Sequence, residues 1–171
     1  MKRVAVLGSS GQIGSHLVGY LRSKNYTVIG FDTVSSTTTQ QERDLRDSSH
    51  FNERVSRDID HVFFLAFDVG GSRYLKQYQH TYEFIHNNIQ LMSNVFDVLG
   101  KSKTPFTFAS SQMSNMSYSP YGVLKTVGEH YTTALGGLVV KFWNVYGVEH
   151  DLEKSHVITD FILKAKNNNK I

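Results

Sequence analysis

Short apolar runs alternate with amphipathic stretches along most of the chain. Five apolar runs predict β-strands, over residues 4–7, 26–31, 61–66, 106–109 and 138–142. Four stretches with apolar residues at helical spacing predict helices, over residues 12–23, 82–99, 120–135 and 157–165. Because strands and helices alternate, we expect an α/β fold in which a mostly parallel sheet carries helices on both faces, in three layers.

Residues with strong conformational preferences mark several of the expected boundaries. Gly100 predicts the C-cap of the second helix, and Ser119 followed by Pro120 predicts the start of the third. The Ser- and Thr-rich run 34–41 predicts a loop. The run 61–66 is almost entirely apolar, which is typical of a strand that is covered on both faces.

The segment 8–14, Gly-Ser-Ser-Gly-Gln-Ile-Gly, lies between the first predicted strand and the first predicted helix. Gly8 permits the tight turn, Gly11 lacks a side chain that would block a pyrophosphate, and Gly14 lets the helix pack close to the sheet. The helix N-terminus then offers free N–H groups and a partial positive charge to the phosphates. In this strand–turn–helix context, the pattern predicts a doubly wound Rossmann fold that binds a dinucleotide.

An acidic residue, Asp32, follows the second predicted strand. A carboxylate at this position accepts hydrogen bonds from the hydroxyls of the adenosine ribose and repels a 2′-phosphate. No Lys or Arg follows Asp32 until Arg43. The sequence therefore favours NAD over NADP.

Tyr121 and Lys125 are four residues apart on a predicted helix, so their side chains share one face. A cation beside a buried tyrosine favours the phenolate, and we expect Lys125 to lower the pKa of Tyr121 toward working pH. Ser110 and Ser111 end the preceding strand, where a hydroxyl can orient a substrate oxygen. This constellation predicts acid–base chemistry between an alcohol and a ketone.

On these residues the sequence resembles the extended short-chain dehydrogenase/reductases, and within them the NAD-dependent epimerase/dehydratase family that acts on nucleotide sugars. Further segments resemble those of the family in the same order: Asp44-Leu45, Leu65-Ala66, Asn88-Ile89, Asn94-Val95, Phe-Ala-Ser-Ser at 108–111 and Asn-Val-Tyr-Gly at 144–147. The chain departs from the family pattern at Phe64, Phe67, Lys141 and Val148.

The resemblance implies a role for each matching residue. It implies that Ser111, Tyr121 and Lys125 are catalytic, and that Ser111, Gln112 and Asn144 contact the nucleotide sugar. It also implies that NAD is bound by a larger set of residues: Gly8, Ser10, Gly11, Gln12, Ile13, Gly14, Asp32, Asp44, Leu45, Leu65, Ala66, Phe67, Asn88, Ser110, Tyr121, Lys125 and Val145.

Two positions bear on the type of reaction. The 4,6-dehydratases of the family carry Asp or Glu just after the catalytic Ser or Thr, whereas this chain has Gln112 and Met113, neither of which exchanges a proton. The segment 67–71 resembles a loop of GDP-fucose synthase and GDP-mannose 3,5-epimerase, but the chain lacks the cysteine that such enzymes use, having none at all. We therefore favour a nucleotide-sugar epimerase or oxidoreductase that acts at C4. A 4,6-dehydratase and a 3,5-epimerase/reductase stay open as alternatives.

The length of the chain qualifies this expectation. Its 171 residues suit one domain, whereas a full member of the resembling family is nearly twice as long. We expect residues 1–150 to form an NAD-binding Rossmann domain and residues 151–171 to begin a substrate-binding lobe that is truncated. Loss of that lobe would lower turnover. An alternative is therefore a module that holds NAD without catalysis, and a further one is an interaction protein with a vestigial cleft.

Composition narrows the remaining classes. The net charge is +3 and no run of Lys or Arg predicts nucleic-acid binding. No stretch is apolar enough to cross a membrane, the absence of cysteine excludes disulfides and thiolate zinc sites, and we expect a cytoplasmic protein. We expect no metal; the densest candidate, Glu149-His150-Asp151, is typical of a solvated turn. The resemblance implies a homodimer through the helices 82–99 and 120–135, and five residues are candidates for that face: Phe84, Leu91, Val95, Val127 and Tyr131.

Overall fold

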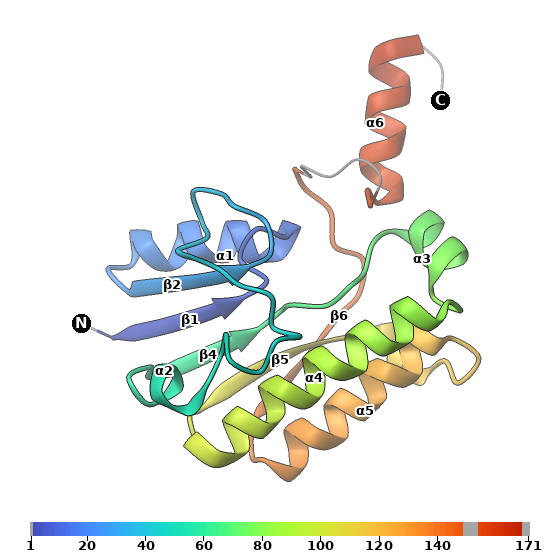
Figure 1. Cartoon of the computed structure of the whole chain (residues 1–171). Helices are drawn as coiled ribbons and strands as arrows, with labels where there is room; N and C mark the ends of the chain where they lie inside the picture. The colour runs from blue at the N-terminus through green and yellow to red at the C-terminus, as the bar shows by residue number, and fades with distance from the viewer. Residues whose placement is uncertain (1, 149–153, 169–171) are drawn as a thin grey trace.

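The computed structural model describes residues 2–148 and 154–168. In it, six parallel strands form a single sheet in the order β3-β2-β1-β4-β5-β6 (Figure 1). The strands are β1 (Arg3–Leu7), β2 (Thr27–Asp32), β3 (Gln41–Glu42), β4 (His61–Phe64), β5 (Phe106–Ser111) and β6 (Leu138–Phe142). The helices are α1 (Gln12–Ser23), α2 (Glu53–Arg57), α3 (Ser72–Tyr78), α4 (Tyr82–Ser102), α5 (Pro120–Ala134) and α6 (Val157–Asn168), with a 3-10 helix η1 (Gln112–Asn115). The predicted Rossmann fold is confirmed, with every strand parallel.

The two faces of the sheet are covered by different helices. Along β1, Val4 and Val6 point to the side of α1, where they pack with Val18. The alternate residues, Ala5 and Leu7, belong to the larger core on the side of α4 and α5 (Figure 1). This alternation follows from the two-residue period of a strand, and it explains why the run is apolar at every position.

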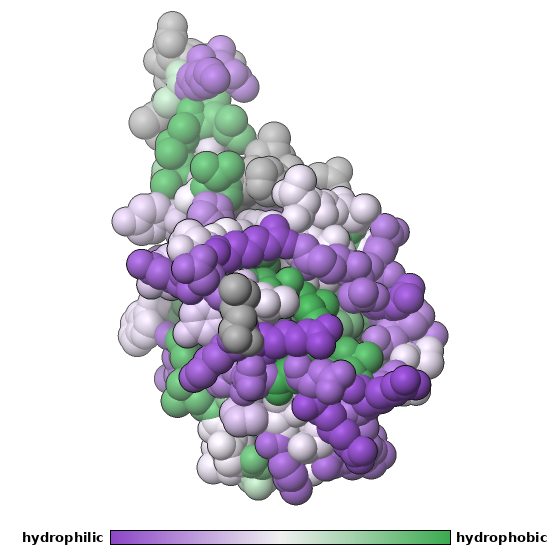
Figure 2. All heavy atoms as spheres, turned by 90° about the vertical axis from the view of Figure 1, so that its left-hand side faces the viewer, coloured by the Kyte–Doolittle hydropathy of each residue, from purple (hydrophilic) through white to green (hydrophobic). Residues whose placement is uncertain are grey.

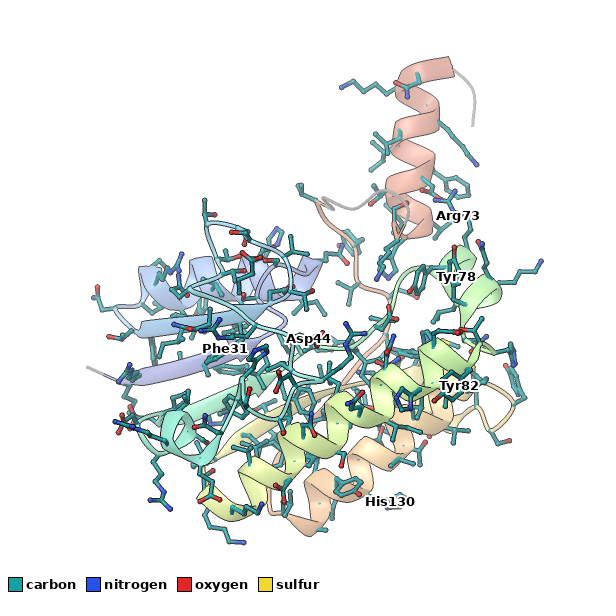
Figure 3. All side chains as sticks on the ribbon, in the orientation of Figure 1. Phe31, Asp44, Arg73, Tyr78, Tyr82 and His130 are labelled. Atoms are coloured by element: carbon teal, nitrogen blue, oxygen red, sulfur yellow. The ribbon has the colours of Figure 1, made fainter. Side chains whose placement is uncertain are left out.

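The larger core is rich in phenylalanine. Phe64, Phe96 and Phe108 are fully buried, and their ring centroids lie 5.3–5.6 Å apart. Phe31 extends this core toward β2, where it lies edge-on to Phe51 (Figure 3). Edge-to-face packing of aromatic rings adds stabilisation beyond the burial of their area. The core therefore ties α4 rigidly to the sheet beneath the carboxyl ends of the strands.

Some predicted boundaries are wrong. The helix α4 does not end at Gly100 but continues to Ser102, and Lys103 caps it in the left-handed conformation with φ of 58°. A Cβ at Gly100 would lie 3.3 Å from Leu135, so this glycine provides space for the end of α5. The strand β4 ends at Phe64, two residues before the predicted end, although the backbone nitrogen of Leu65 still donates a hydrogen bond of 2.9 Å to Leu7 of β1. The sequence analysis did not anticipate β3, α2, α3 or η1.

The helix α6 projects from the body of the molecule and contacts it mainly near its N-terminal end (Figures 1 and 2). The guanidinium of Arg73 on α3 (Figure 3) lies 3.7 Å from the carboxylate of Asp160 on α6. Lys154 forms an ion pair of 3.1 Å with Asp68. A Cβ at Gly71 would lie 2.1 Å from the backbone oxygen of Ser155, so the two segments touch through their backbones. Four apolar side chains of α6 are exposed: Val157, Ile158, Phe161 and Ile162.

Candidate functional site

The glycine turn joins β1 to α1 at the carboxyl edge of the sheet. Gly8 has a φ of 87°, and a Cβ there would lie 2.7 Å from the backbone nitrogen of Ala66. A Cβ at Gly14 would lie 2.0 Å from the backbone oxygen of Gly8. These two glycines are therefore required by close packing of backbone against backbone.

Gly11 has a different environment. It is the N-cap of α1 in an extended conformation, and the nearest atom to a Cβ there would be the backbone oxygen of Gly8 at 3.5 Å. No side chain caps the helix, and the first turn contains no acidic residue. In addition, Nε2 of Gln12 is buried without a hydrogen-bond partner among the described residues. An open helix N-terminus with an unsatisfied donor beside it fits an anionic group such as a pyrophosphate.

Asp32 lies next to this turn. Its Oδ2 accepts a hydrogen bond of 2.8 Å from the backbone nitrogen of Ser10, and its Oδ1 accepts one of 3.1 Å from that of Val34. A carboxylate has about four acceptor positions, so two are still available for a ribose. The hydroxyl of Ser10 bonds to Ser36 at 2.7 Å and to Thr39 at 2.7 Å. The polar run 34–41 is therefore an ordered loop that supports the turn.

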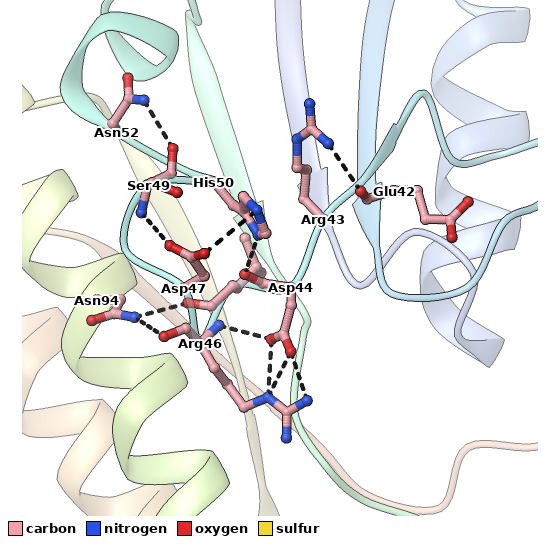
Figure 4. A network of polar contacts seen from close by, with 10 residues as sticks. Glu42, Arg43, Asp44, Arg46, Asp47, Ser49, His50, Asn52 and Asn94 are labelled. Carbon is pink, nitrogen blue, oxygen red and sulfur yellow. Dashed lines mark hydrogen bonds and ion pairs between the residues drawn. The ribbon is translucent and has the colours of Figure 1, made fainter.

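Asp44 and Leu45 lie in the next loop, which is held by an ion-pair network (Figure 4). The carboxylate of Asp44 binds Arg46 through two parallel contacts of 2.9 Å and 2.6 Å, and the hydrogen bonds from Arg46 lower the pKa of Asp44. Asn94 on α4 donates to the backbone oxygens of Leu45 and Arg46. Leu45 is buried in the core, so its side chain is not available to a ligand. The sequence analysis singled out Asn94 by resemblance alone and missed Arg46.

The segment after β4 passes beneath the glycine turn and is held by Asn88. The Oδ1 of this buried side chain accepts a hydrogen bond of 2.8 Å from the backbone nitrogen of Asp68. Its Nδ2 donates to the backbone oxygens of Phe84 and Asp68. The amide of Asn88 thus faces the chain's own backbone, and it positions Ala66 and Phe67 through the loop.

Ser111 and Tyr121 lie near each other at the carboxyl end of β5. Ser111 ends β5 and Tyr121 is the second residue of α5, which brings the Ser111 hydroxyl close enough to Tyr121 to act on its pKa. Tyr121 is 8% exposed, and burial raises its pKa, while Ser111 acts in the opposite direction. The expectation that Lys125 lowers the pKa of Tyr121 is therefore wrong for this structure, because desolvation dominates.

The ammonium group of Lys125 is fully buried and turned toward the sheet. Its Nζ donates a hydrogen bond of 2.8 Å to the backbone oxygen of Ala109 and lies 3.7 Å from the ring centroid of Phe67. The same Nζ is 5.8 Å from the ring centroid of Tyr121. Burial lowers the pKa of Lys125 to about 7, although Glu129 acts to raise it. Lys125 thus titrates near neutral pH, which suits a group that exchanges protons.

Ser110 does not point to the same place as Ser111. Its hydroxyl donates a hydrogen bond of 2.5 Å to Glu129 on α5, and it is buried. Glu129 also forms an ion pair of 3.0 Å with Lys141 on β6. The sequence analysis missed Glu129, although its spacing of four residues from Lys125 would have placed the two on one helical face.

Four of the predicted cofactor residues meet in one hollow. Gln12, Ile13, Leu65 and Val145 line a cavity of about 570 Å³. The cavity continues along α1 and the adjacent face of the sheet, where its lining is apolar: Leu17, Tyr20, Phe63, Val140 and Phe142. The candidate site therefore includes only the end of the cavity that is lined by Gln12, Ile13, Leu65 and Val145.

The other predicted residues lie near the rim of the site or outside the described part of the chain. Gln112 begins η1 directly after Ser111, and Asn144 is exposed beyond β6. The segment Glu149-His150-Asp151 lies outside the described residues. Within the described ranges, no group of three His, Cys, Asp or Glu side chains is arranged to hold a metal ion, and no helix is long and apolar enough to span a membrane.

Fold and site together define a Rossmann domain with an open glycine turn and a Ser–Tyr–Lys group at the same edge of the sheet. The chain matches the NAD dependent epimerase/dehydratase family over residues 4–171 and belongs to that family. GDP-mannose 3,5-epimerase 1 of Oryza sativa subsp. indica is 27% identical, over 85% of this chain and 47% of that protein. The chain thus spans about half the length of the curated relatives it matches.

Solved structures resemble the whole described fold. A UDP-galactose 4-epimerase is 26% identical with a TM-score of 0.77, over 99% of this chain and 64% of that chain. TunA, an NAD-dependent NDP-hexosamine 5,6-dehydratase involved in tunicamycin biosynthesis, has a TM-score of 0.81 at 18% identity, over 99% of this chain and 63% of that chain. The second likeness concerns the fold alone.

Proposed function

We propose that this chain binds NAD across the carboxyl edge of the sheet. The pyrophosphate lies on the glycine turn at the N-terminus of α1, and the adenosine ribose bonds to Asp32. The open space at Gly11 and the unsatisfied Nε2 of Gln12 support this placement. The nicotinamide end then extends from β1 past β4 toward β5, which is two strands away.

We further propose that the protein oxidises and re-reduces a nucleotide sugar at C4. When bound, NAD would supply the acceptor for a hydride from C4 and the donor that returns it to the other face of the sugar. In the first step the C4 hydroxyl loses its proton to the phenolate form of Tyr121, whose own proton has passed to solvent beforehand, while the C4–H bond breaks with loss of hydride and a C4 ketone forms. Ser111 orients the sugar oxygen, and Lys125 is the buried cation one turn further along α5. In the second step Tyr121 gives the proton back.

The proximity of Ser111 to Tyr121, with buried Lys125 one turn further along α5, is the observation that carries this proposal. The residues that follow Ser111 support epimerisation over dehydration. Gln112 and Met113 form the start of η1, and neither side chain can remove or add a proton.

A 3,5-epimerase is the second candidate. Its support is the similarity to the rice GDP-mannose 3,5-epimerase and the segment 67–71, whose Gly71 packs closely against Ser155. The lack of cysteine in this chain weighs against it, because relatives of that type use a thiol at the position of Gln112. The two candidates are separated by their products, which differ in configuration at C4 or at C3 and C5.

A panel of UDP-, GDP- and dTDP-sugars with NAD tests the proposal. We expect NAD to raise the melting temperature, and one sugar class to be converted to its C4 epimer. Tyr121→Phe should abolish conversion while NAD still raises the melting temperature. NAD binding with no conversion of any sugar would reduce the function to binding alone, and the absence of any thermal shift would contradict the proposal.

We also propose a homodimer through the outer faces of α4 and α5. Phe84 and Val95 are buried in the core, so the expectation that they form this face is wrong. The exposed apolar residues there are Ile89, Val123, Val127 and Tyr131. Light scattering should give twice the mass of the chain, and Val127→Glu should shift the protein to a monomer; a monomer in the unaltered protein would contradict this part.

A further inference from the structure

The side chain of Glu129 joins three elements directly behind the Ser–Tyr–Lys group. It lies on α5, where Oε1 accepts the hydrogen bond from Ser110 at the end of β5. Its Oε2 lies 3.0 Å from Nζ of Lys141 on β6. The carboxylate therefore fixes α5 against the ends of two neighbouring strands.

Glu129 also lies one helical turn beyond Lys125, on the same face of α5. The ammonium group of Lys125 is buried between the backbone of Ala109 and the ring of Phe67. An opposite charge one helical turn away favours the protonated form of a buried amine. Glu129 is the residue that supplies it.

We propose that Glu129 is a positioning residue of the site: its carboxylate keeps Lys125 cationic and, through Ser110, holds the end of β5 that presents Ser111. This inference rests on the proposed function, since it assigns Glu129 to the same Ser–Tyr–Lys group. Glu129 touches neither substrate nor cofactor in this proposal. It acts through Lys125 and through the backbone between Ser110 and Ser111.

The charge of Glu129 is secured by its own surroundings. Burial acts to raise the pKa of Glu129, but the hydrogen bond from Ser110, with further contributions that include Lys141, outweighs burial, and the pKa is lowered. Two titratable groups face this pair: the ring of Tyr121 on α5 lies 5.8 Å from Nζ of Lys125, and Lys141 on β6 pairs with Glu129. The carboxylate thus stays ionised throughout the range in which Lys125 titrates.

The two possible roles of Glu129, a purely structural anchor and a positioning residue, lead to different expectations for the pKa of Lys125. The test is the titration of Lys125 in protein labelled with ¹³C and ¹⁵N lysine, without NAD or sugar, and the resonance is assigned by its loss in Lys125→Arg. Glu129→Gln keeps the size and a hydrogen-bond acceptor but removes the charge. We expect Lys125 in this variant to lose its proton at a pH lower by at least half a unit, about a threefold change in the protonation ratio.

Lys141→Met is the matched control. It removes the ion pair of Glu129 and hence part of the anchor, but leaves the carboxylate and frees it from a competing cation. We expect Lys125 in this variant to titrate at the same pH as in the unaltered protein or higher. A lower value would overturn the proposal, even if Glu129→Gln failed to fold. An unchanged titration in folded Glu129→Gln would overturn it as well.

The outcome is separable from the test of the proposed function. Lys125 is measured without ligands, so a failure to bind NAD would contradict the proposed function and leave the titration result intact. If NAD binds and the titration of Lys125 is the same in Glu129→Gln as in the unaltered protein, only the positioning role is wrong.

Discussion

The two halves of the sheet build their parts of the site by different means. In the half formed by β3, β2 and β1, backbone and glycines that provide space make up most of the site, with the carboxylate of Asp32 beside them. In the half formed by β4, β5 and β6, it is made of side chains, among them a fully buried lysine. The structure of the first half therefore depends on the space that its glycines leave, and that of the second half depends on the buried charge of Lys125.

This difference predicts which substitutions each half tolerates. A change in volume should damage the glycine half and a change in charge should leave it folded. In the half with Lys125, the free energy of unfolding should instead respond to charge, and removal of the buried charge should raise it, because a buried charge costs folding free energy that an apolar side chain of similar size does not.

The largest effect is expected for Gly14→Ala. The added Cβ would lie 2.0 Å from the backbone oxygen of Gly8, so α1 must move away from the turn. We expect a loss of about 3 kcal/mol in the free energy of unfolding, measured by urea denaturation. Gly19→Ala on the same helix is the control, because nothing lies within 4 Å of its added Cβ. It should gain up to about 1 kcal/mol. Equal stability of the two variants would contradict this account.

Lys125→Met should stabilise the protein, and more at pH 6 than at pH 9. Burial lowers the pKa of Lys125 to about 7 in the folded state, whereas an unfolded lysine titrates near 10.5. Between these values the unfolded state binds more protons, so the stability of the unaltered protein rises with pH. The gain from the substitution should therefore be about 2.7 kcal/mol larger at pH 6 than at pH 9.

Lys101→Met is the comparison for this result. Lys101 is exposed on α4 and pairs with Asp97, so its replacement should have nearly the same small effect at both pH values. A gain from Lys125→Met that does not depend on pH would show that Lys125 is not desolvated as the structure indicates.

A smaller effect is expected for the selectivity between NAD and NADP, which we assign to Asp32 in the half with the glycine turn. Asp32 repels a 2′-phosphate, so the unaltered protein should bind NAD more tightly than NADP. In Asp32→Asn the charge is lost, and we expect the ratio of the two affinities to fall by about tenfold, or about 1.4 kcal/mol. Calorimetric titration of both cofactors measures it, and an unchanged ratio would remove Asp32 from the ribose site.

The sequence predicted the fold class, a mostly parallel sheet with helices on both faces, and the glycine turn, because these follow from local patterns. The period of the apolar residues places β1 and α1, and the spacing of Gly8, Gly11 and Gly14 has a direct steric meaning. The resemblance assigned Ser111 and Tyr121 to one site, and the structure brings the two residues near each other, whereas their catalytic roles stay a prediction.

The features that escaped prediction depend on contacts between distant segments. The ion pair of Arg46 with Asp44 exists because a loop is folded back on itself and tied to α4 by Asn94. The raised pKa of Tyr121 depends on burial, which spacing on a helix does not reveal. The end of α4 was misjudged because Gly100 serves packing against Leu135 rather than capping.

The central claim is that the open glycine turn receives the phosphates of NAD, and Gly11→Ala tests it most directly. A Cβ at Gly11 would lie 3.5 Å from the backbone oxygen of Gly8, which is an ordinary van der Waals distance, and the extended backbone of Gly11 suits alanine. The free energy of unfolding should therefore change by less than about 1 kcal/mol. The added methyl group would project into the space of the pyrophosphate. Calorimetric titration with NAD should therefore show binding by the unaltered protein and at least tenfold weaker binding by Gly11→Ala. Equal affinities in the two proteins would contradict the claim.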